Sequence, residues 1–332
     1  MSSTPAEWEQ HRATWLAWPH NVSDWPGRFG PIPWVYAEIV RRISAGEKVR
    51  LLVGSLEAKA RAVLRKADVD LANVEFLRIP TDRVWTRDSG PIFLKPGTIG
   101  HFRFNAWAKY PDFRKDARIP ERAAKAKGYE LADVGGAVLE GGAIDLNGRG
   151  SILATEECLL DPAVQVRNPG FSRADYEKLF RETLGAPNTI WLGKGIAGDD
   201  THGHVDDLAR FIGPKTILLC AERNPSDPNY RPLHENWERL QSARLEDGSR
   251  PEILPFPMPQ PVVFDGQRLP ASYANFYICN AAVLVPVFDD PNDAMAVGLL
   301  GEILKRPAIG IHARDLVWGL GTLHCLSQQE PA

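Results

Sequence analysis

The residue best suited to covalent chemistry in this chain is Cys325, near its C-terminal end. It follows two glycines and a histidine in residues 319–325, GLGTLHC, and it precedes a polar tail. A free thiol has a pKa of about 8.5, so a nucleophilic cysteine needs a lowered pKa or an adjacent base. Neighbouring side chains of a strand point to opposite faces, so His324 is not the expected partner. The base is expected in another segment.

The other three cysteines lie in apolar, strand-like runs, for example residues 217–220, ILLC. Free cysteine is among the most buried residue types, so we interpret Cys158, Cys220 and Cys279 as small hydrophobic core residues. The chain contains no C-x-x-C pair, which excludes a zinc ribbon. Its length and the lack of an export signal favour free thiols over disulfides.

Two histidines and four acids fall within nine residues, 199–207, DDTHGHVDD. In an extended chain His202, His204 and Asp206 would share one face, because side chains alternate along a strand. Such a face can bind a metal or place an acid/base beside a carboxylate. Residues 199–207 are therefore a rich source of candidates for the base.

Two further carboxylates lie next to glycine-containing turns. Asp88 belongs to residues 85–91, WTRDSGP, just before a strand-like run, and loop ends of this kind commonly carry sites. The structural alternative is that Asp88 caps a turn while Trp85 packs in the core. Glu140 ends an apolar run and precedes two glycines, which allow the backbone to approach a site closely. An exposed turn carboxylate is the alternative for Glu140.

Helix and strand patterns alternate along the chain and must position these residues. Together they favour an α/β or α+β fold over an all-β fold. Asn147-Gly148, between two apolar runs, predicts a β-hairpin. The proline-rich residues 251–261 are interpreted as a domain linker or a rigid surface loop. Helices are expected at 35–43, 56–67, 172–184 and 293–304, and strands at 48–53, 74–79, 189–192, 217–220, 282–285 and 308–312.

The composition is that of a globular protein, with 332 residues, 44% hydrophobic and 24% charged. This length fits one large domain or two average ones. A net charge of -3 without a basic stripe argues against a nucleic-acid partner, whereas mild acidity suits a cationic substrate. We find no signal-peptide pattern and no apolar run near the roughly 20 residues of a membrane span. A cytoplasmic location without a membrane partner is therefore expected.

The four candidate segments, taken in their order along the chain, resemble the guanidine-modifying superfamily. They are residues 85–91, 140–145, 199–207 and 319–325. The resemblance is greatest to its agmatine deiminase and bacterial peptidylarginine deiminase branch. Any one segment is a weak signal, but the similarity recurs along nearly the whole chain. The segments that carry it further are 5–11, PAEWEQH; 14–19, TWLAWP; 104–107, FNAW; 155–160, TEECLL; 227–230, DPNY; 271–277, ASYANFY; and 324–331, HCLSQQEP.

The resemblance implies a fold that composition does not show. This fold is a five-bladed α/β propeller, or pentein, with pseudo-fivefold symmetry and a central active site. It also implies that residues 1–332 form a single catalytic domain. The recurring strand–helix–strand units of the chain are compatible with that architecture.

The resemblance also implies a role for each candidate residue. Paired carboxylates grip a planar guanidinium through charge-assisted, fork-like hydrogen bonds, and a thiolate then attacks its central carbon. No metal or organic cofactor is required, the expected partner is a small cationic guanidine substrate, and the expected assembly is a homodimer. The implied roles are nucleophile for Cys325, general acid/base for His204, orientation of that histidine for Glu140, guanidinium binding for Asp88 and Asp206, and an aromatic contact near the guanidinium for Trp85.

The motifs depart from those usual in agmatine deiminases, which leaves the substrate's identity open. The departures are at Thr86, Ser89, His202, Leu320, Thr322 and Leu323. The leading expectation is conversion of agmatine to N-carbamoylputrescine and ammonia in polyamine synthesis. Deimination of another guanidine compound or of peptidylarginine is the alternative within the same chemistry. A metal-dependent hydrolase using His202, His204 and Asp206, and a non-catalytic guanidinium-binding protein, are the alternatives from other classes.

Overall fold

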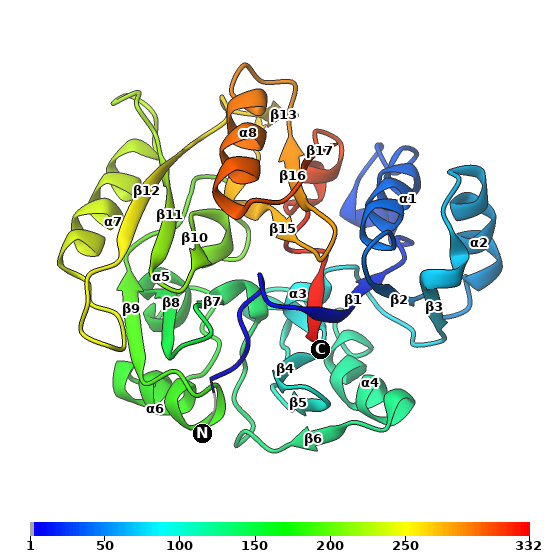
Figure 1. Cartoon of the computed structure of the whole chain (residues 1–332), viewed down its shortest axis with the longest axis horizontal. Helices are drawn as coiled ribbons and strands as arrows, with labels where there is room; N and C mark the ends of the chain where they lie inside the picture. The colour runs from blue at the N-terminus through cyan, green and yellow to red at the C-terminus, as the bar shows by residue number, and fades with distance from the viewer. Residues whose placement is uncertain (1–2) are drawn as a thin grey trace.

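Five sheets that share one strand pattern form most of the structure, a computed structural model that describes residues 3–332 (Figure 1). In four of them an antiparallel pair is followed by a third strand that is parallel to the second. These sheets contain β4 (Ile92–Lys95), β5 (Thr98–Gly100) and β6 (Glu130–Ala132); β7 (Ile144–Leu146), β8 (Ser151–Thr155) and β9 (Asn188–Leu192); β10 (Ala209–Gly213), β11 (Thr216–Ala221) and β12 (Glu252–Pro257); and β15 (Tyr277–Ile278), β16 (Val283–Val287) and β17 (Ala308–His312).

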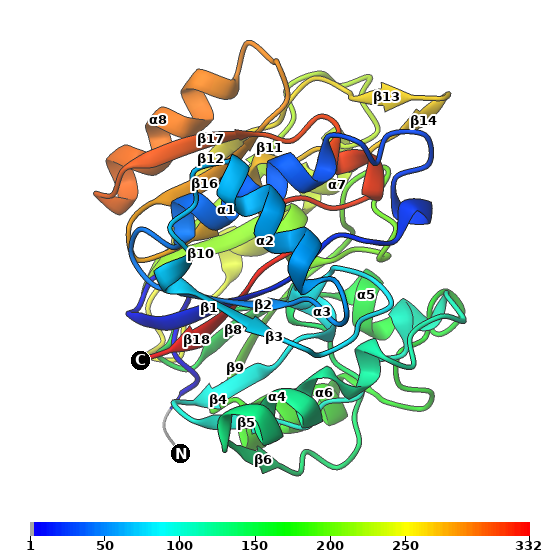
Figure 2. The ribbon, with the colours of Figure 1, turned by 90° about the vertical axis from the view of Figure 1, so that its right-hand side faces the viewer.

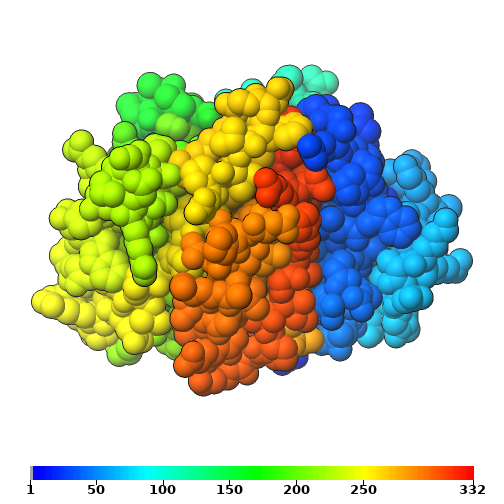
Figure 3. Space-filling model, turned by 90° about the horizontal axis from the view of Figure 1, so that it is seen from above, coloured from blue at the N-terminus to red at the C-terminus, as the bar shows by residue number. Residues whose placement is uncertain are grey.

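The remaining large sheet is built from both ends of the chain. β18 (Gln328–Pro331) pairs antiparallel with β1 (His11–Ala17), and β1 is parallel to β2 (Lys48–Leu52). β3 (Val74–Leu77) adds one more parallel strand. The last strand of the chain therefore takes the place that the first strand holds in the other sheets. Figure 3 shows the C-terminal segments, in orange and red, lying directly beside the N-terminal ones in blue.

Helices join the parallel strands and lie towards the outside of this ring (Figures 1 and 2). Parallel strands require such a crossover connection, because a tight turn cannot join them. A further hairpin, β13 (Val263–Phe264) with β14 (Gln267–Arg268), lies outside the pattern. No helix in residues 3–332 combines the length and the apolar character needed to cross a membrane. The helices are α1 (Ile32–Ile43), α2 (Glu57–Lys66), α3 (Thr86–Ser89), α4 (Ile119–Lys127), α5 (Glu156–Leu160), α6 (Arg173–Thr183), α7 (Tyr230–Ser242) and α8 (Asp293–Leu304).

Several predicted elements have the predicted local chemistry. α6 begins after Ser172, whose side chain and that of Asp175 form a reciprocal capping box. The β7–β8 hairpin is confirmed. The side-chain oxygen of Asn147 accepts hydrogen bonds from the backbone amides of residues 149–151 at 2.9–3.1 Å. α8 and β17 occupy the predicted residues.

The interpretation of residues 251–261 as a linker or loop is wrong for residues 252–257, whereas residues 258–261 do form a loop. Glu252–Pro257 forms β12, which is parallel to β11 and pairs with that strand alone. Proline cannot donate a ladder hydrogen bond, so it is tolerated in a strand at the edge of a sheet. Pro255 and Pro257 lie in such an edge strand, which explains how a proline-rich run belongs to the sheet.

The closing strand β18 is held by a buried carboxylate. Glu330 Oε2 accepts a hydrogen bond from Trp15 Nε1 (2.8 Å), and Glu330 Oε1 accepts from Arg50 Nη2 (3.0 Å) and from the hydroxyl of Tyr129 (2.6 Å). Glu330 and Arg50 are both buried. The C-terminal strand thus joins β1, β2 and the neighbouring sheet through one side chain.

Replacing Glu330 with alanine is expected to lower the free energy of unfolding by about 3 kcal/mol or more, because it leaves the Arg50 guanidinium buried without its main counter-charge. Chemical denaturation followed by circular dichroism measures this. Glu38→Ala is the matched control, since its pairs with Arg41 and Arg42 are partly exposed and contribute about 0–1 kcal/mol. Equal losses in the two variants would contradict the prediction.

Candidate active site

The candidate site forms where five equivalent segments meet. In each of the five sheets, a short turn or 3-10 segment precedes the strand that begins the pattern. Successive segments contact one another: α3 contacts residues 141–143, these contact residues 205–207, and these in turn contact residues 273–275. Each of the five supplies a polar side chain. They are Asp88 before β4, Glu140 before β7, His204 and Asp206 before β10, Asn275 before β15, and Cys325 before β18.

Cys325 lies at a cavity of about 310 Å³, which Asp88 and Trp85 also line. Cys325 is only 6% exposed, although a polar tail follows it in the sequence. Its segment is also a turn and not a strand, with Leu320 in the left-handed backbone region at a φ of 69°. The thiol is therefore reached through the cavity and is shielded elsewhere.

Asn275 organises the backbone around this thiol, and sequence reasoning did not assign it. Its Nδ2 donates to Cys325 Sγ (3.1 Å), and its Oδ1 accepts from the amides of His324 (3.0 Å) and Cys325 (3.3 Å). Oδ1 also accepts from the Thr322 hydroxyl (2.8 Å). The signal was present, because Asn275 lies in the segment 271–277 that carries the family resemblance.

Burial, together with the negative charges of Asp206, Asp207 and Asp88, raises the pKa of the Cys325 thiol well above its ordinary value. The hydrogen bond from Asn275 opposes this rise in pKa only in part. The protein without substrate therefore holds a protonated thiol at neutral pH. A nearby positive charge would shift that balance towards the thiolate.

Trp85 packs in the core, as the structural alternative expected, but Asp88 also lines the cavity. Asp88 is buried, its Oδ2 accepts from Trp107 Nε1 (2.9 Å), and its Oδ1 accepts from the amide of Gly142 (3.1 Å). Burial and the charges of Asp206 and Glu140 raise the pKa of Asp88 to about 6, although His204 and Trp107 act in the opposite direction. The carboxylate is thus ionised at neutral pH but gains strongly from a cation.

Backbone strain accompanies the Trp107 contact. Residues 106–108 have three consecutive positive φ values, 52°, 57° and 53°, although none of them is glycine. Such conformations cost on the order of 1–3 kcal/mol each and persist only where the surroundings determine them. The Asn105 side chain supports this turn by accepting from the amide of Ala108 (3.0 Å). The strained turn presents the Trp107 indole to Asp88.

Asp206 faces the thiol from the other side of the site. Its Oδ2 lies 2.6 Å from His324 Nδ1 and 3.8 Å from Cys325 Sγ. Its Oδ1 is buried and has no hydrogen-bond partner within residues 3–332. Burial alone would raise the pKa of Asp206, but the hydrogen bond and charge of His324 outweigh it and lower the pKa. An ionised carboxylate with one uncommitted oxygen beside a thiol is suited to accept N–H donors of a cation.

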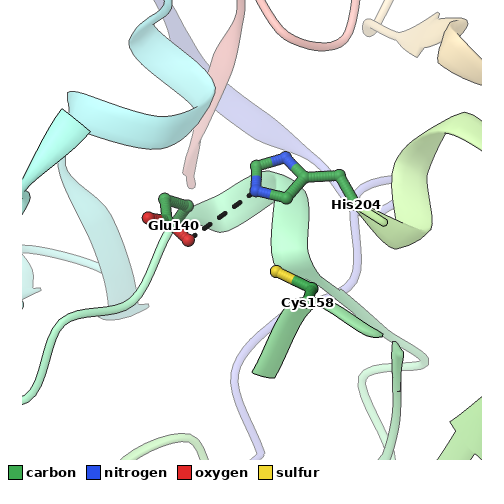
Figure 4. A group of neighbouring side chains, drawn as sticks. All are labelled: Glu140, Cys158 and His204. Atoms are coloured by element: carbon green, nitrogen blue, oxygen red, sulfur yellow. Dashed lines mark ion pairs between the residues drawn. The ribbon is translucent and has the colours of Figure 1, made fainter. Parts of the chain in front are cut away.

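His204 lies between the carboxylates of Asp88 and Glu140, and Figure 4 shows its ion pair with Glu140. Its Nδ1 is 3.8 Å from Asp88 Oδ1 and its Nε2 is 3.7 Å from Glu140 Oε2, and neither ring nitrogen has a hydrogen-bond partner in the described part of the chain. Burial would lower the pKa of His204, but Asp88, Cys158 and Glu140 raise it well above its ordinary value. His204 is therefore a protonated imidazole that lies beside Asp88, a residue of the cavity lining.

Glu140 is fixed by a buried arginine. Arg167 Nε lies 3.2 Å from both carboxylate oxygens of Glu140, and neither side chain is exposed. Burial opposes ionisation, but Arg167 and His204 lower the pKa of Glu140 below its ordinary value. The exposed-turn alternative for Glu140 is therefore wrong. Arg167 is a second residue of the site that sequence reasoning missed, since an isolated arginine in a loop carries no motif.

The predicted face of His202, His204 and Asp206 does not form. Residues 205–207 are a 3-10 turn, and His202 has a φ of 65°, so the chain is not extended. His202 Nε2 instead lies 2.9 Å from Asp161 Oδ2 in a partly exposed position. These three residues therefore cannot serve as one metal-ligand set.

Two other groups in the described residues have metal-ligand spacing. Glu140, Cys158 and His204 place their ligand atoms within 4.8 Å of one another, as do Asp206, Asp207 and Cys325. Cys158, predicted to be a buried core cysteine, is buried, and Figure 4 shows its sulfur directed towards His204. Cys220 and Cys279 are buried as predicted.

His324 lies beside the nucleophile in sequence but contacts other groups. Its Nδ1 faces Asp206, and its Nε2 lies 2.7 Å from Glu7 Oε2. No hydrogen bond joins His324 to the Cys325 sulfur in residues 3–332. The expectation that His324 is not the base for Cys325 agrees with this geometry, although the reason given, a strand at this position, does not hold.

Tight packing keeps the polar groups in register. A Cβ atom on Gly142 would lie 2.5 Å from His204 Nδ1 and 2.8 Å from Asp88 Oδ1, so only glycine fits there. A Cβ atom on Gly321 would lie 2.8 Å from the ring of Trp85, which is buried against Trp25 at a centroid distance of 5.7 Å. Trp85 thus forms a wall of the cavity beside Cys325.

Comparison with known proteins identifies the family. The model of the Porphyromonas-type peptidyl-arginine deiminase family matches residues 3–331, and the chain belongs to this family. The agmatine deiminase of Ectopseudomonas mendocina is 31% identical over 99% of this chain and 95% of its own length. A substrate-bound cysteine-to-serine variant of the C. jejuni agmatine deiminase is 32% identical, with a TM-score of 0.90 over 100% of this chain and 97% of that one.

A third relative supports the same fold. The agmatine deiminase of Enterococcus faecalis is 25% identical, with a TM-score of 0.92 over 99% of this chain and 96% of that one. Together with the five repeated sheets, these similarities confirm the predicted propeller architecture.

Replacing Asp206 with asparagine is expected to speed alkylation of Cys325 by iodoacetamide at pH 7, by about tenfold for each unit by which the thiol pKa falls. Removing a negative charge near the sulfur lowers the pKa of the thiol, and a lower pKa gives more thiolate. Mass spectrometry of the labelled peptide over a range of pH gives the rate. Asp161→Asn, which removes a carboxylate paired with His202 away from the cavity, should leave the rate unchanged. A rate in Asp206→Asn at or below that of the wild type would rule out this account of the thiol.

Proposed function

We propose that this protein is an agmatine deiminase, which converts agmatine and water to N-carbamoylputrescine and ammonia. The observation that carries the proposal is the pair of buried carboxylates, Asp88 and Asp206, that flank the Cys325 thiol. Membership of the deiminase family and the agmatine deiminases among its relatives support the same reaction. The enzyme is then a hydrolase of the C–N bond of a linear amidine.

Substrate binding would create the nucleophile. The guanidinium donates N–H groups to Asp88 and to the uncommitted Oδ1 of Asp206, while Trp85 covers one side of the cavity. Its positive charge offsets the acids that help to keep the thiol of Cys325 protonated, so the pKa of the thiol falls on binding and the thiol releases its proton to solvent. The sulfur lies 3.8 Å from Asp206 Oδ2, and this short distance supports attack on the central carbon of a guanidinium bound by that carboxylate.

His204 would move the protons. Attack of the thiolate on the guanidinium carbon gives a tetrahedral adduct, and His204 protonates the nitrogen that leaves as ammonia. The C–N bond breaks and a covalent thiouronium on Cys325 remains. His204, now neutral, takes a proton from water as its oxygen attacks the same carbon. Expulsion of the sulfur yields the ureido product, while Glu140 holds the imidazole in place.

The setting of the enzyme follows from the same proposal. The substrate is a small cation, the whole of residues 1–332 serves as one catalytic domain, and the reaction proceeds in the cytoplasm without a metal or organic cofactor. A homodimer is the proposed assembly. Peptidylarginine is the second candidate substrate, favoured by the Trp85-Thr86-Arg87-Asp88 sequence and by the description of the family.

A panel of guanidines tests the proposal directly. Ammonia release from agmatine should exceed release from free arginine and from an arginyl peptide, and Cys325→Ala should reduce it to background. Cys279→Ala is the matched control, because Cys279 is equally buried but lies outside the cavity lining. The proposal fails if the wild-type protein releases ammonia from none of these compounds, or if Cys325→Ala remains active.

The acid limb of kcat/KM for agmatine is expected near pH 6. Only ionised Asp88 can hold the guanidinium, and its pKa of about 6 in the free protein means that kcat/KM falls as the pH is lowered through that value. The hydrogen bond from Trp107 lowers the pKa of Asp88, so Trp107→Phe should move the limb to higher pH. Initial rates between pH 4.5 and 8 measure the acid limb in the wild-type protein and in Trp107→Phe, and circular dichroism checks that both proteins are folded. A flat profile down to pH 5, or a limb that moves to lower pH in Trp107→Phe, would refute this assignment.

A further inference from the structure

A second buried carboxylate site lies in the wall of the same cavity. Asp24 ends the 3-10 segment Val22–Asp24 and lines the cavity together with Asp88 and Cys325. Its side chain is only 1% exposed. Oδ1 accepts from Arg83 Nη1, whereas Oδ2 is buried and accepts no hydrogen bond from any of the residues described. A buried carboxylate oxygen without a donor is costly unless a ligand supplies one.

The charged neighbours of Asp24 already have partners. Arg83 also donates to Asp112 Oδ1 (3.1 Å) and lies 4.4 Å from the centre of the Tyr110 ring, so its charge is compensated. Asp200, another lining carboxylate, accepts from Lys109 with one oxygen and from the Tyr110 hydroxyl (2.6 Å) with the other. Asp88 likewise has both oxygens engaged. Within residues 3–332, Asp24 is therefore the lining carboxylate that retains an oxygen without a bond.

The size of the cavity limits what can reach both acids. A volume of about 310 Å³ is at the lower end of the roughly 300–1,000 Å³ of small-molecule sites. Trp85 and Trp107 contribute apolar surface to the lining, and Ser23, Asp24, Arg83, Tyr110 and Asp200 contribute polar groups. A slender ligand with an apolar middle and two polar ends fits this lining better than a branched one.

We infer that Asp24 Oδ2 accepts a hydrogen bond from a primary ammonium group at the end of the substrate remote from the guanidinium. This inference rests on the proposed function, since it assumes that the guanidinium lies between Asp88 and Asp206. A four-carbon chain beside the tryptophans then carries the second cation to Asp24. Free arginine would bring a carboxylate towards Asp24 and Asp200, and like charges repel in a buried site. An arginyl peptide has no cation there at all.

Burial and the charge of Asp112 raise the pKa of Asp24 to about 6, although the charge of Arg83 opposes the rise. The carboxylate is thus ionised at neutral pH while remaining poorly solvated. An ammonium group that displaces no other donor would stabilise it through a charge-assisted hydrogen bond. Asp24 is in this sense a specificity-determining residue, because the bond it forms depends on the end group of the ligand.

Binding to an inactive protein tests the inference apart from turnover. Titration calorimetry on Cys325→Ala should compare agmatine with n-pentylguanidine, in which a methyl group replaces the ammonium. Agmatine is expected to bind at least tenfold more tightly, since hydrogen bonds to charged groups contribute about ten- to hundredfold in affinity. Adding Asp24→Asn should reduce this preference to about threefold or less. Adding Asp112→Asn instead, which also removes a partner of Arg83 but lies outside the cavity lining, should preserve it.

The outcomes separate this inference from the proposed function. A preference that survives in Asp24→Asn, or an equal loss for both ligands, would overturn the ammonium site and leave deimination of agmatine untouched. If the ammonium preference depends on Asp24 but the wild-type protein releases no ammonia from agmatine, the proposed reaction fails and the site stands. Failure of agmatine to bind Cys325→Ala would overturn both.

Discussion

Like charges buried around one thiol are the constraint on which the rest of this structure depends. Asp88, Asp206 and Glu140 are all buried in the same region, where carboxylates repel one another and resist ionisation. Each carboxylate is stabilised by different partners. Glu140 is paired with Arg167, Asp206 with His324, and Asp88 relies on two hydrogen bonds and on His204 at 3.8 Å. Only Asp88 keeps a raised pKa, so it gains most from a bound cation.

The fold solves the problem of bringing these groups together. Residues that are far apart in sequence occupy one place in the repeated pattern, immediately before the first strand of a sheet. Five sheets around one centre therefore deliver five polar segments to that centre. Closure by β18 is essential to this arrangement, because the segment that carries Cys325 leads directly into that strand. Stability of the ring and assembly of the site are consequently linked through Glu330, Arg50 and their neighbours.

Much of the fold and of the site could be predicted from the sequence, because their signals are local. Capping by Ser172, the Asn147 turn and the helix-forming composition of α8 each depend on residues close together in the sequence. The propeller fold was predicted from the family resemblance, which also implied that five residues form one site. These residues are Asp88, Glu140, His204, Asp206 and Cys325. The geometry agrees with that grouping, and their catalytic roles are still proposals.

What the sequence could not show depends on contacts between distant segments. Asn275, Trp107 and Arg167 act through hydrogen bonds to residues in other segments, and a polar residue in a loop does not reveal its partner. His202 was misplaced because alternation was assumed where the chain turns. Residues of β12 were interpreted as a linker or loop because of their prolines. A strand can contain proline when it lies at the edge of a sheet, and the sequence does not show which strands are at an edge.

The raised pKa of Cys325 links recognition to reactivity. A thiol that is protonated at rest reacts slowly with stray electrophiles, because the thiolate is the nucleophile. A guanidinium bound between Asp88 and Asp206 would lower the pKa of the thiol, since it would neutralise two of the three negative charges that raise this pKa together with burial. A neutral ligand of the same shape would leave those charges in place. The substrate's own charge would then be part of the catalytic apparatus, and selection for a cation would occur in the chemical step as well as in binding.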